Sequence, residues 1–386
     1  MNVLHVIPSL ASADGGPTRA LCLMERSLAA LGVTVETATT DDDGRNRSNG
    51  KVGAEQLLEN GVTRLYFPKL LEFYKVSPDF ARWILQHARD YDVVHIHALF
   101  SFTSVAAAWA ARRAGVPYVL RPLGTLTRYG VTQRRPWLKR VSLAWLEGPA
   151  LRAAAAVHFT SADEQREAAQ TGIPMNGVVI PLGIDAFKPA DRSVVNWHMS
   201  ALQGARYLLY LSRLDPKKNV EGLLRAFSLC GPHWPDVKLL IAGDGAPAYV
   251  AGLKALADEL GLASNVVWGG HIDGDLKASA LSGAELFVLP SFSENFGIAA
   301  AEALMAGLPC VLGQGVAIAQ DVVNAGAGFA VAPDPASIAA GLMQVMADPQ
   351  VRADMSARAV ALAQDKYSAQ VMGASLVQLY SRILGQ

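Results

Sequence analysis

Short apolar runs rich in β-branched residues alternate along the chain with longer Ala- and Leu-rich stretches whose apolar residues recur at helical spacing. This alternation predicts a parallel β-sheet covered by helices. A helix is expected from about Pro17 to Leu31, because proline suits a first helical turn and Gly32 suits the position after the end. The strands expected in the first half are Val3 to Pro8, Val33 to Thr37, Val93 to His97, Tyr118 to Arg121 and Ala156 to Thr160.

The same rhythm restarts after residues 182–203, a stretch without clear period that we interpret as an interdomain linker. The strands expected in the second half are Tyr207 to Leu211, Val237 to Ala242, Asn265 to Trp268, Leu286 to Leu289 and Pro309 to Leu312. We therefore expect an α/β protein with two similar domains, residues 1–190 and 191–367. The amphipathic end, about 368–386, is expected to pack back on the first domain. Ligands of open α/β sheets bind beyond the carboxyl ends of the strands, so two facing domains predict an interdomain cleft.

Composition excludes several classes of protein. Of 386 residues, 51% are hydrophobic, which excludes disorder and fibrous repeats, and 34 basic side chains balance 34 acidic ones, so no global charge attracts nucleic acid. The three cysteines form no C-x-x-C pair, which fits a reducing compartment. No run of 18 apolar residues predicts a membrane span. The first residues lack the basic start of a signal peptide, so we expect a buried strand there and a cytoplasmic protein.

The most informative segment is residues 289–309. We expect a strand that ends at Pro290, a polar loop, and a helix that begins near Gly297 and ends before Gly307. Backbone N–H groups of residues 295–299 would then stabilise a phosphate at the helix start. Glu294 in the loop and Glu302 on the helix could each accept hydrogen bonds from neighbouring hydroxyls, as in a phosphate flanked by two polyols. Two solvated surface acids are the alternative.

A second segment, residues 207–219, places three cations between an apolar strand and a helix that starts near Val220. Arg213 offers a planar fork and Lys218 a point charge, the two ways in which proteins hold a diphosphate. A solvated basic turn is the alternative, and it suits Lys217 better than Arg213. Together the two segments favour a nucleotide-sugar site.

These residues resemble motifs of the retaining glycosyltransferases of family four, also called glycosyl transferases group 1, which have the GT-B fold of two facing Rossmann-like domains. Glu294 and Glu302 match the family's paired glutamates, and Arg213 and Lys218 match its arginine and lysine. Weaker matches in the expected order extend the likeness over nearly the whole chain: residues 240–245, 268–272, 179–185 and 15–17. The resemblance implies a metal-independent hexosyltransferase-type enzyme without a cofactor.

The resemblance also implies a role for each matched position. Arg213 and Lys218 would bind the diphosphate and stabilise the charge of the leaving group, Glu294 would bind the transferred sugar, and Glu302 would bind the ribose. The remaining donor-binding residues would be the helix start at Asn295, Phe296, Gly297 and Ile298, the base-side residues His271 and Ile272, and Gly15 and Gly16 from the first domain.

The chain departs from the family at one position, because many relatives carry a histidine in the loop after the strand that ends at Arg121. His95 and His97, two residues apart and so on one face of a strand, are the nearest substitutes. His97 and Arg121 are therefore candidates for the acceptor side. A histidine hydrogen-bonded beneath the loop is the alternative for His97, and a metal site is disfavoured because no third ligand is evident.

Residues 112–152 contain nine basic side chains and a single acid, Glu147, with Trp137 and Trp145 among the cations. Such a stretch predicts peripheral contact with anionic lipid, and a solvated helix face or an acceptor-phosphate pocket is the alternative. The predicted partners are thus a UDP- or GDP-sugar donor and a glycan or lipid-linked acceptor.

The sequence predicts a transferase of polysaccharide or cell-surface glycan biosynthesis. A non-catalytic nucleotide-sugar-binding subunit and a nucleotide-sugar 2-epimerase remain alternatives, because each could share the architecture. A dinucleotide-dependent oxidoreductase is disfavoured. Residues 243–248 fit G-x-G-x-x-A, but Pro247 is awkward there and the acid expected about 20 residues later is missing.

Overall fold

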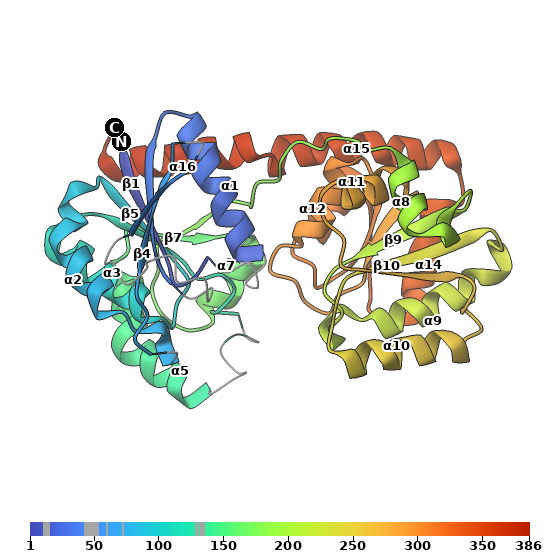
Figure 1. The fold of residues 1–386 in the computed structure, drawn as a ribbon, viewed down its shortest axis with the longest axis horizontal. Helices are drawn as coiled ribbons and strands as arrows, with labels where there is room; N and C mark the ends of the chain where they lie inside the picture. The colour runs from blue at the N-terminus through green and yellow to red at the C-terminus, as the bar shows by residue number, and fades with distance from the viewer. Residues whose placement is uncertain (11–15, 42–53, 59–60, 72, 128–129, 131–135) are drawn as a thin grey trace. The chain divides into compact units, whose positions relative to one another are not determined.

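The computed structural model describes residues 1–10, 16–41, 54–58, 61–71, 73–127, 130 and 136–386. The chain forms two compact units (Figure 1). The first unit comprises residues 1–183 and 369–386, and the second comprises residues 184–368. Both are α/β units built on parallel sheets, as the sequence predicts.

Within the described residues, the sheet of the first unit has eight strands in the order β3-β4-β2-β1-β5-β6-β7-β8, all parallel except for the β3–β4 pair. The strands are β1 (Asn2–Ile7), β2 (Thr34–Thr40), β3 (Ala54–Leu57), β4 (Thr63–Phe67), β5 (Val93–His97), β6 (Tyr118–Arg121), β7 (Ala156–Phe159) and β8 (Gly177–Val179). All five strands expected here are confirmed within a few residues, whereas β3, β4 and β8 were not predicted.

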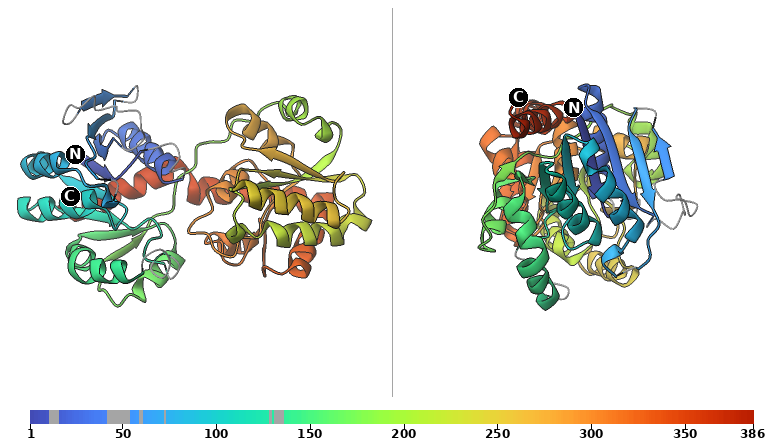
Figure 2. Two further views of the ribbon diagram at one scale, coloured as in Figure 1. Left: turned by 60° about the horizontal axis from the view of Figure 1, so that its bottom comes forward. Right: turned by 90° about the vertical axis from the view of Figure 1, so that its left-hand side faces the viewer.

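Helices cover both faces of this sheet. They are α1 (Gly16–Ala30), α2 (Pro78–His87), α3 (Phe102–Ala114), α5 (Pro136–Ser142), α6 (Gly148–Ala153), α7 (Ala162–Ala169) and α16 (Ala369–Leu384). Helix α2 packs on α3, and α1 packs on α16. The C-terminal helix thus belongs to the first unit, where the two termini lie close together (Figures 1 and 2).

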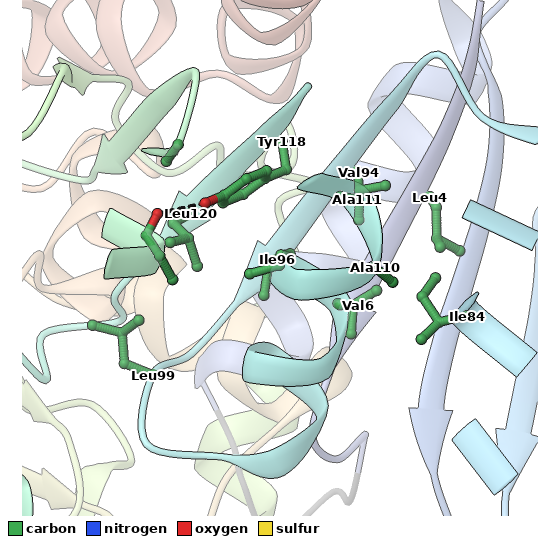
Figure 3. Packing of buried hydrophobic residues seen from close by; sticks show 14 of the residues in the cluster. Leu4, Val6, Ile84, Val94, Ile96, Leu99, Ala110, Ala111, Tyr118 and Leu120 are labelled. Carbon is green, nitrogen blue, oxygen red and sulfur yellow. Dashed lines mark hydrogen bonds between the residues drawn. The ribbon is translucent and has the colours of Figure 1, made fainter. Parts of the chain in front are cut away.

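The side chains of the central strands alternate between the two faces of the sheet. Leu4, Val94 and Ile96 belong to an apolar core that also includes residues of α2 and α3 (Figure 3). Tyr118 lies in the same core, and its hydroxyl donates a 2.6 Å hydrogen bond to the carbonyl of Ala150. The intervening positions, whose side chains therefore point to the opposite face, carry buried polar residues: His5, His95, His97, Arg121 and His158.

The second unit has a six-stranded sheet, parallel throughout, in the order β11-β10-β9-β12-β13-β14. The strands are β9 (Arg206–Leu211), β10 (Val237–Ala242), β11 (Val266–Gly270), β12 (Leu286–Leu289), β13 (Cys310–Gly313) and β14 (Gly328–Val331). The helices are α8 (Arg192–His198), α9 (Val220–Cys230), α10 (Pro247–Glu259), α11 (Gly274–Gly283), α12 (Ile298–Met305), α13 (Ala319–Ala325), α14 (Pro335–Met346) and α15 (Pro349–Tyr367). Strands β9 and β12 are separated by two strands in the chain but are neighbours in the sheet, so the loops that follow them lie together.

The chain passes from the first unit to the second within residues 182–203, but most of this stretch belongs to the second unit and contains a helix. The first unit ends at Gly183, and the backbone N–H of Ile184 donates to the carbonyl of Tyr367 within the second unit. Helix α8 then packs on α11, with the side-chain oxygen of Ser279 accepting from the N–H of Val195 at 3.0 Å. A seven-residue helix has too few turns for its period to be visible in the sequence. No helix among the described residues is long and apolar enough to cross a membrane.

Candidate functional site

The loop between β12 and α12 has the conformation expected for an anion site. Gly297 caps the helix with a φ of 96°, and Gly307 follows its end with a φ of 80°, both in the left-handed region that glycine tolerates. The first helical hydrogen bond runs from the N–H of Ala301 to the carbonyl of Gly297 at 3.0 Å. The N–H groups before Ala301 therefore lie at the positive end of the helix.

Backbone contacts hold this loop against two others. The N–H of Glu294 donates to the carbonyl of Gly315 at 2.8 Å, and the N–H of Phe292 donates to the carbonyl of Lys217 at 3.0 Å. A Cβ at Gly315 would lie 2.0 Å from the carbonyl oxygen of Phe292, so only glycine fits there. The carboxyl ends of β9, β12 and β13 thus form one rigid platform.

Lys218 and Glu294 form an ion pair on this platform. Lys218 ends the short 3₁₀ turn Pro216–Lys218 after β9, and Glu294 lies in the loop after β12. Their side chains are only 11% and 19% exposed, so the pair is largely shielded from solvent. The structure brings together two residues that the sequence motifs identified separately.

Glu302 on α12 has a cationic partner that the sequence analysis missed. Lys277 on α11 donates a 2.8 Å hydrogen bond from its ammonium to the carboxylate, and the two side chains are 15% and 13% exposed. Lys277 lies in a short helix without a motif of its own, where Asp275 is the other charged residue, so the sequence carried no signal for this pair. Each proposed carboxylate is therefore paired with a lysine.

Arg213 is exposed, and its backbone carbonyl accepts a hydrogen bond from the hydroxyl of Tyr210 at 3.3 Å. Burial raises the pKa of Tyr210 well above its usual value, and the charge of Glu294 adds to the shift. Of the predicted base-side residues, His271 is exposed and Ile272 is buried.

A cavity of about 500 Å³ lies at the carboxyl ends of β9, β10 and β11. It is lined by Leu214, Gly243, Asp244, Gly245, Pro247, Val250, Ala251, Lys254, Trp268 and Gly270. Gly243 has a φ of 144°, and a Cβ there would lie 1.9 Å from the carbonyl oxygen of Ser212. Close loop packing thus explains Gly243, and it explains Gly245 in the same way, because a Cβ there would lie 2.3 Å from the carbonyl oxygen of Leu214. The sequence G-x-G-x-x-A therefore gives no support to a dinucleotide site.

The candidates in the first unit are differently placed. Gly15 lies outside the described residues, and Gly16 is the first residue of α1. His97 is completely buried, and Arg121 is nearly so. Nδ1 of His5 and Nε2 of His97 are 2.8 Å apart, and Arg121 lies 3.5 Å from Nδ1 of His97. Neither candidate therefore offers an exposed surface that an acceptor could contact in this structure.

The expectation that His95 and His97 lack a third ligand is wrong, because the ring of His5 lies beside both and ligand atoms of the three are within 4.8 Å of one another. Burial lowers the pKa of all three rings and so favours their neutral form. The guanidinium of Arg121 opposes a bound cation, however. His95 also shares a hydrogen bond of 2.7 Å with Tyr380 on α16. This layer of polar side chains fits a role in fixing α16 to the sheet better than it fits a metal site.

Two family models match the chain in succession. The model described as "Glycosyl transferase 4-like domain" matches residues 15–183, and "Glycosyl transferases group 1" matches residues 200–361. The chain belongs to glycosyltransferase family 4. The paired glutamates, Arg213 and Lys218 all lie within the second match.

Curated family 4 relatives include the phosphatidyl-myo-inositol mannosyltransferase of Mycolicibacterium smegmatis, 31% identical over 54% of this chain and 53% of the relative. The D-inositol 3-phosphate glycosyltransferase of Streptomyces scabiei is 29% identical over 73% of this chain and 66% of the relative. The chain thus spans about half to two thirds of the length of these relatives. The α-D-kanosaminyltransferase of Streptomyces kanamyceticus is 28% identical over 75% of this chain and 77% of the relative.

Solved structures share the GT-B fold. The sucrose-phosphate synthase of Thermosynechococcus elongatus superposes with a TM-score of 0.79 at 20% identity, covering 100% of this chain and 99% of that one. Anabaena HepE in complex with UDP superposes with a TM-score of 0.79 at 22% identity, covering 99% and 100% of the two chains. At these identities the likeness establishes the fold alone. This family 4 chain therefore has the two Rossmann-like sheets of GT-B.

Proposed function

We propose that this protein transfers a sugar, with retention of anomeric configuration, from a nucleoside-diphosphate donor to a hydroxyl of a glycan or a lipid-linked saccharide. The observation that carries the proposal is the arrangement of two lysine–glutamate pairs, Lys218–Glu294 and Lys277–Glu302, around the loop and helix at the start of α12. Polysaccharide or cell-surface glycan synthesis at a membrane is the process that such a reaction would serve.

The diphosphate would be held without a metal ion. An ammonium has three donors, so Lys218 could keep its bond to Glu294 and still donate to a phosphate oxygen. The exposed fork of Arg213 and the amides of Asn295, Phe296 and Gly297 would supply the remaining donors. The Lys218–Glu294 ion pair would then link the lysine that binds the phosphate to the glutamate that binds the sugar.

The carboxylates would hold the polyols on either side. Glu294 would accept hydrogen bonds from hydroxyls of the transferred sugar, and Glu302, fixed by Lys277, would accept them from the ribose. The base would lie along residues 270–272, beside the cavity between the loops of β9, β10 and β11. UDP is the favoured nucleotide, because HepE of the same fold has been solved with UDP and with UDP-glucose.

In the reaction, the bond from the anomeric carbon to the diphosphate oxygen breaks and leaves negative charge on that oxygen. Lys218, Arg213 and the amides at the start of α12 would stabilise this charge, and losing one such donor often costs about 10²- to 10³-fold in rate. The acceptor hydroxyl attacks from the same face and gives its proton to the departing oxygen. No nucleophile from the protein is then required.

Support for the acceptor comes from the relatives. One is named for mannosyl transfer to phosphatidyl-myo-inositol, a lipid, and others for transfer to inositol 3-phosphate. A lipid-linked saccharide is therefore a reasonable first acceptor class. Peripheral membrane contact through residues 112–152 completes the proposal.

The decisive experiment has two stages. A thermal-shift screen with UDP, GDP and ADP identifies the nucleotide, because a ligand bound only by the folded state raises the melting temperature. The protein is then incubated with the matching nucleotide sugars, and slow release of nucleoside diphosphate is expected. Lys218→Ala and Glu302→Ala should each lower this release at least about tenfold.

Lys366→Ala is the matched control, because it breaks a Lys366–Asp321 ion pair of 2.6 Å elsewhere in the second unit. Its turnover should equal that of the wild type. Unchanged turnover in both Lys218→Ala and Glu302→Ala would refute the site. Nucleotide-sugar binding without release would instead support a binding subunit, and release of an epimerised sugar would support an epimerase.

A further inference from the structure

A ridge of exposed apolar side chains projects from the first unit. Trp137, Val141 and Trp145 are 66%, 52% and 78% exposed, and Leu146 beside them is 45% exposed. We call these four residues the Trp ridge. Contiguous exposed apolar side chains of this size are unusual on a monomeric surface and mark a site of interaction.

The local structure explains why the ridge faces outward. Helix α5 continues into a single π-helical turn, Leu143–Glu147, and then into α6. Trp137, Val141 and Trp145 recur every four residues, so they share one side of this helical segment. Glu147, at its end, is buried. In this segment the largest apolar side chains are therefore exposed and the acidic side chain is buried, which is the opposite of a typical amphipathic helix of a globular protein.

The exposed charges of the stretch 112–152, which includes the ridge, have one sign. Four of the nine basic residues of 112–152 are exposed: Arg112, Arg113, Arg140 and Arg152. The single acid of the stretch, Glu147, is buried. Lys139 is half-buried, and its ammonium donates to the carbonyl of Gly130 at 2.5 Å. Arg121 is buried in the sheet, and Arg128, Arg134 and Arg135 lie outside the described residues.

We propose that the Trp ridge and its flanking arginines dock the protein on the surface of an anionic lipid bilayer. Tryptophan, with its large apolar ring and its polar N–H, favours the headgroup region, and arginine is attracted to anionic headgroups. Helices that lie in this region combine bulky apolar residues with basic ones. A surface that binds a protein partner would more often carry charges of both signs.

The docking surface is connected to the carboxyl end of β5. The carboxylate of Glu147 accepts a hydrogen bond from the hydroxyl of Tyr74 at 2.8 Å and from the backbone N–H of Phe100 at 2.9 Å. Phe100 has a φ of 57°, an unusual conformation held in place by this contact. Docking would therefore place this end of the sheet, where ligands of α/β folds bind, near the bilayer. The proposal thus rests on the proposed transfer to a lipid-linked acceptor.

The test is cosedimentation of the full chain with vesicles of phosphatidylcholine and phosphatidylglycerol, and with vesicles of phosphatidylcholine alone. Wild type should bind the anionic vesicles strongly and the neutral ones weakly. Trp137→Ala/Trp145→Ala should lower the partition coefficient at least about tenfold. Arg140→Ser/Arg152→Ser should weaken binding to the anionic vesicles only.

Leu229→Ala/Val351→Ala is the matched control, because it removes two apolar side chains of the second unit that are 52% and 43% exposed. It should bind like the wild type. Equal vesicle binding by wild type and the tryptophan variant would overturn the proposal. Wild-type dimers that the tryptophan variant converts to monomers, without vesicle binding, would overturn it in favour of self-association.

Release of UDP from UDP-glucose in the absence of vesicles separates this proposal from the proposed function. The tryptophan variant should retain wild-type release, and its melting temperature should show that it is folded. A wild type that binds vesicles but releases no UDP would refute the transferase alone. A wild type that releases UDP but binds no vesicle would refute the docking surface alone.

Discussion

Replacing Lys277 by methionine tests whether Glu302 binds the ribose. The change removes the positive charge but keeps most of the side-chain volume. It leaves the carboxylate of Glu302, 13% exposed, without the ammonium that now lies 2.8 Å away. The loss of this ammonium would weaken the hold on the position in which Glu302 could accept hydrogen bonds from the ribose.

The size of the effect follows from the geometry. A hydrogen bond from a neutral hydroxyl to a charged carboxylate contributes about 1.5 to 3 kcal/mol. If Glu302 loses its position, the nucleotide loses this contribution from its ribose hydroxyls. The dissociation constant should then rise by about 10- to 150-fold, since 1.4 kcal/mol corresponds to a factor of ten.

Isothermal titration calorimetry with UDP, or with whichever nucleotide gives the largest thermal shift, measures the change. A 2′,3′-dideoxy analogue of that nucleotide should bind wild type and Lys277→Met with nearly equal affinity, because it lacks the hydroxyls in question. Lys366→Met, which removes a more exposed ion pair of the second unit, is the control for lost charge. Equal UDP affinity in wild type and Lys277→Met, or the same loss with the dideoxy analogue, would refute the assignment.

Three further predictions concern the platform and the buried polar layer. A Cβ at Gly315 would lie 2.0 Å from the carbonyl oxygen of Phe292. Gly315→Ala should therefore abolish nucleotide binding, while circular dichroism should show that the variant is still folded. Tyr380→Phe should lower the free energy of unfolding by about 1 to 3 kcal/mol in urea, because His95 loses its partner. Burial lowers the pKa of His5 from 6.5 to about 3. The unfolded chain therefore binds more protons below pH 6.5, and the melting temperature should fall between pH 6.5 and 4.5.

Much of the fold could be predicted from local pattern. The strands that end at His97, Arg121, Ala242 and Leu289 were predicted to the residue, because apolar β-branched runs with clear turn signals mark buried parallel strands. The short elements β3, β8, β14 and α8 were not predicted. Each has seven residues or fewer, so its state depends on the neighbours that it packs against rather than on its own period.

The candidate site was predicted only in part. Glu294 and Glu302 lie in the predicted loop and helix, but Lys277 was missed and the burial of His97 was left open. Partners in such pairs are distant in sequence: Lys218 and Glu294 are 76 residues apart, and Lys277 and Glu302 are 25 apart. Contact between the paired side chains depends on which strands and helices are neighbours in the fold. The hydrophobic periodicity of the sequence does not reveal those neighbours.

The sequence by itself determined two α/β units, the order of their motifs and the candidate residues for a phosphate site, because hydrophobic period and backbone-specific residues such as Gly297 act locally. The tertiary structure alone decided which charges neutralise one another, which histidines are buried beneath α16, and which tryptophans remain exposed. These outcomes depend on burial and on distances between remote segments. Those quantities are set only when β9 lies beside β12 and the helices cover the sheets.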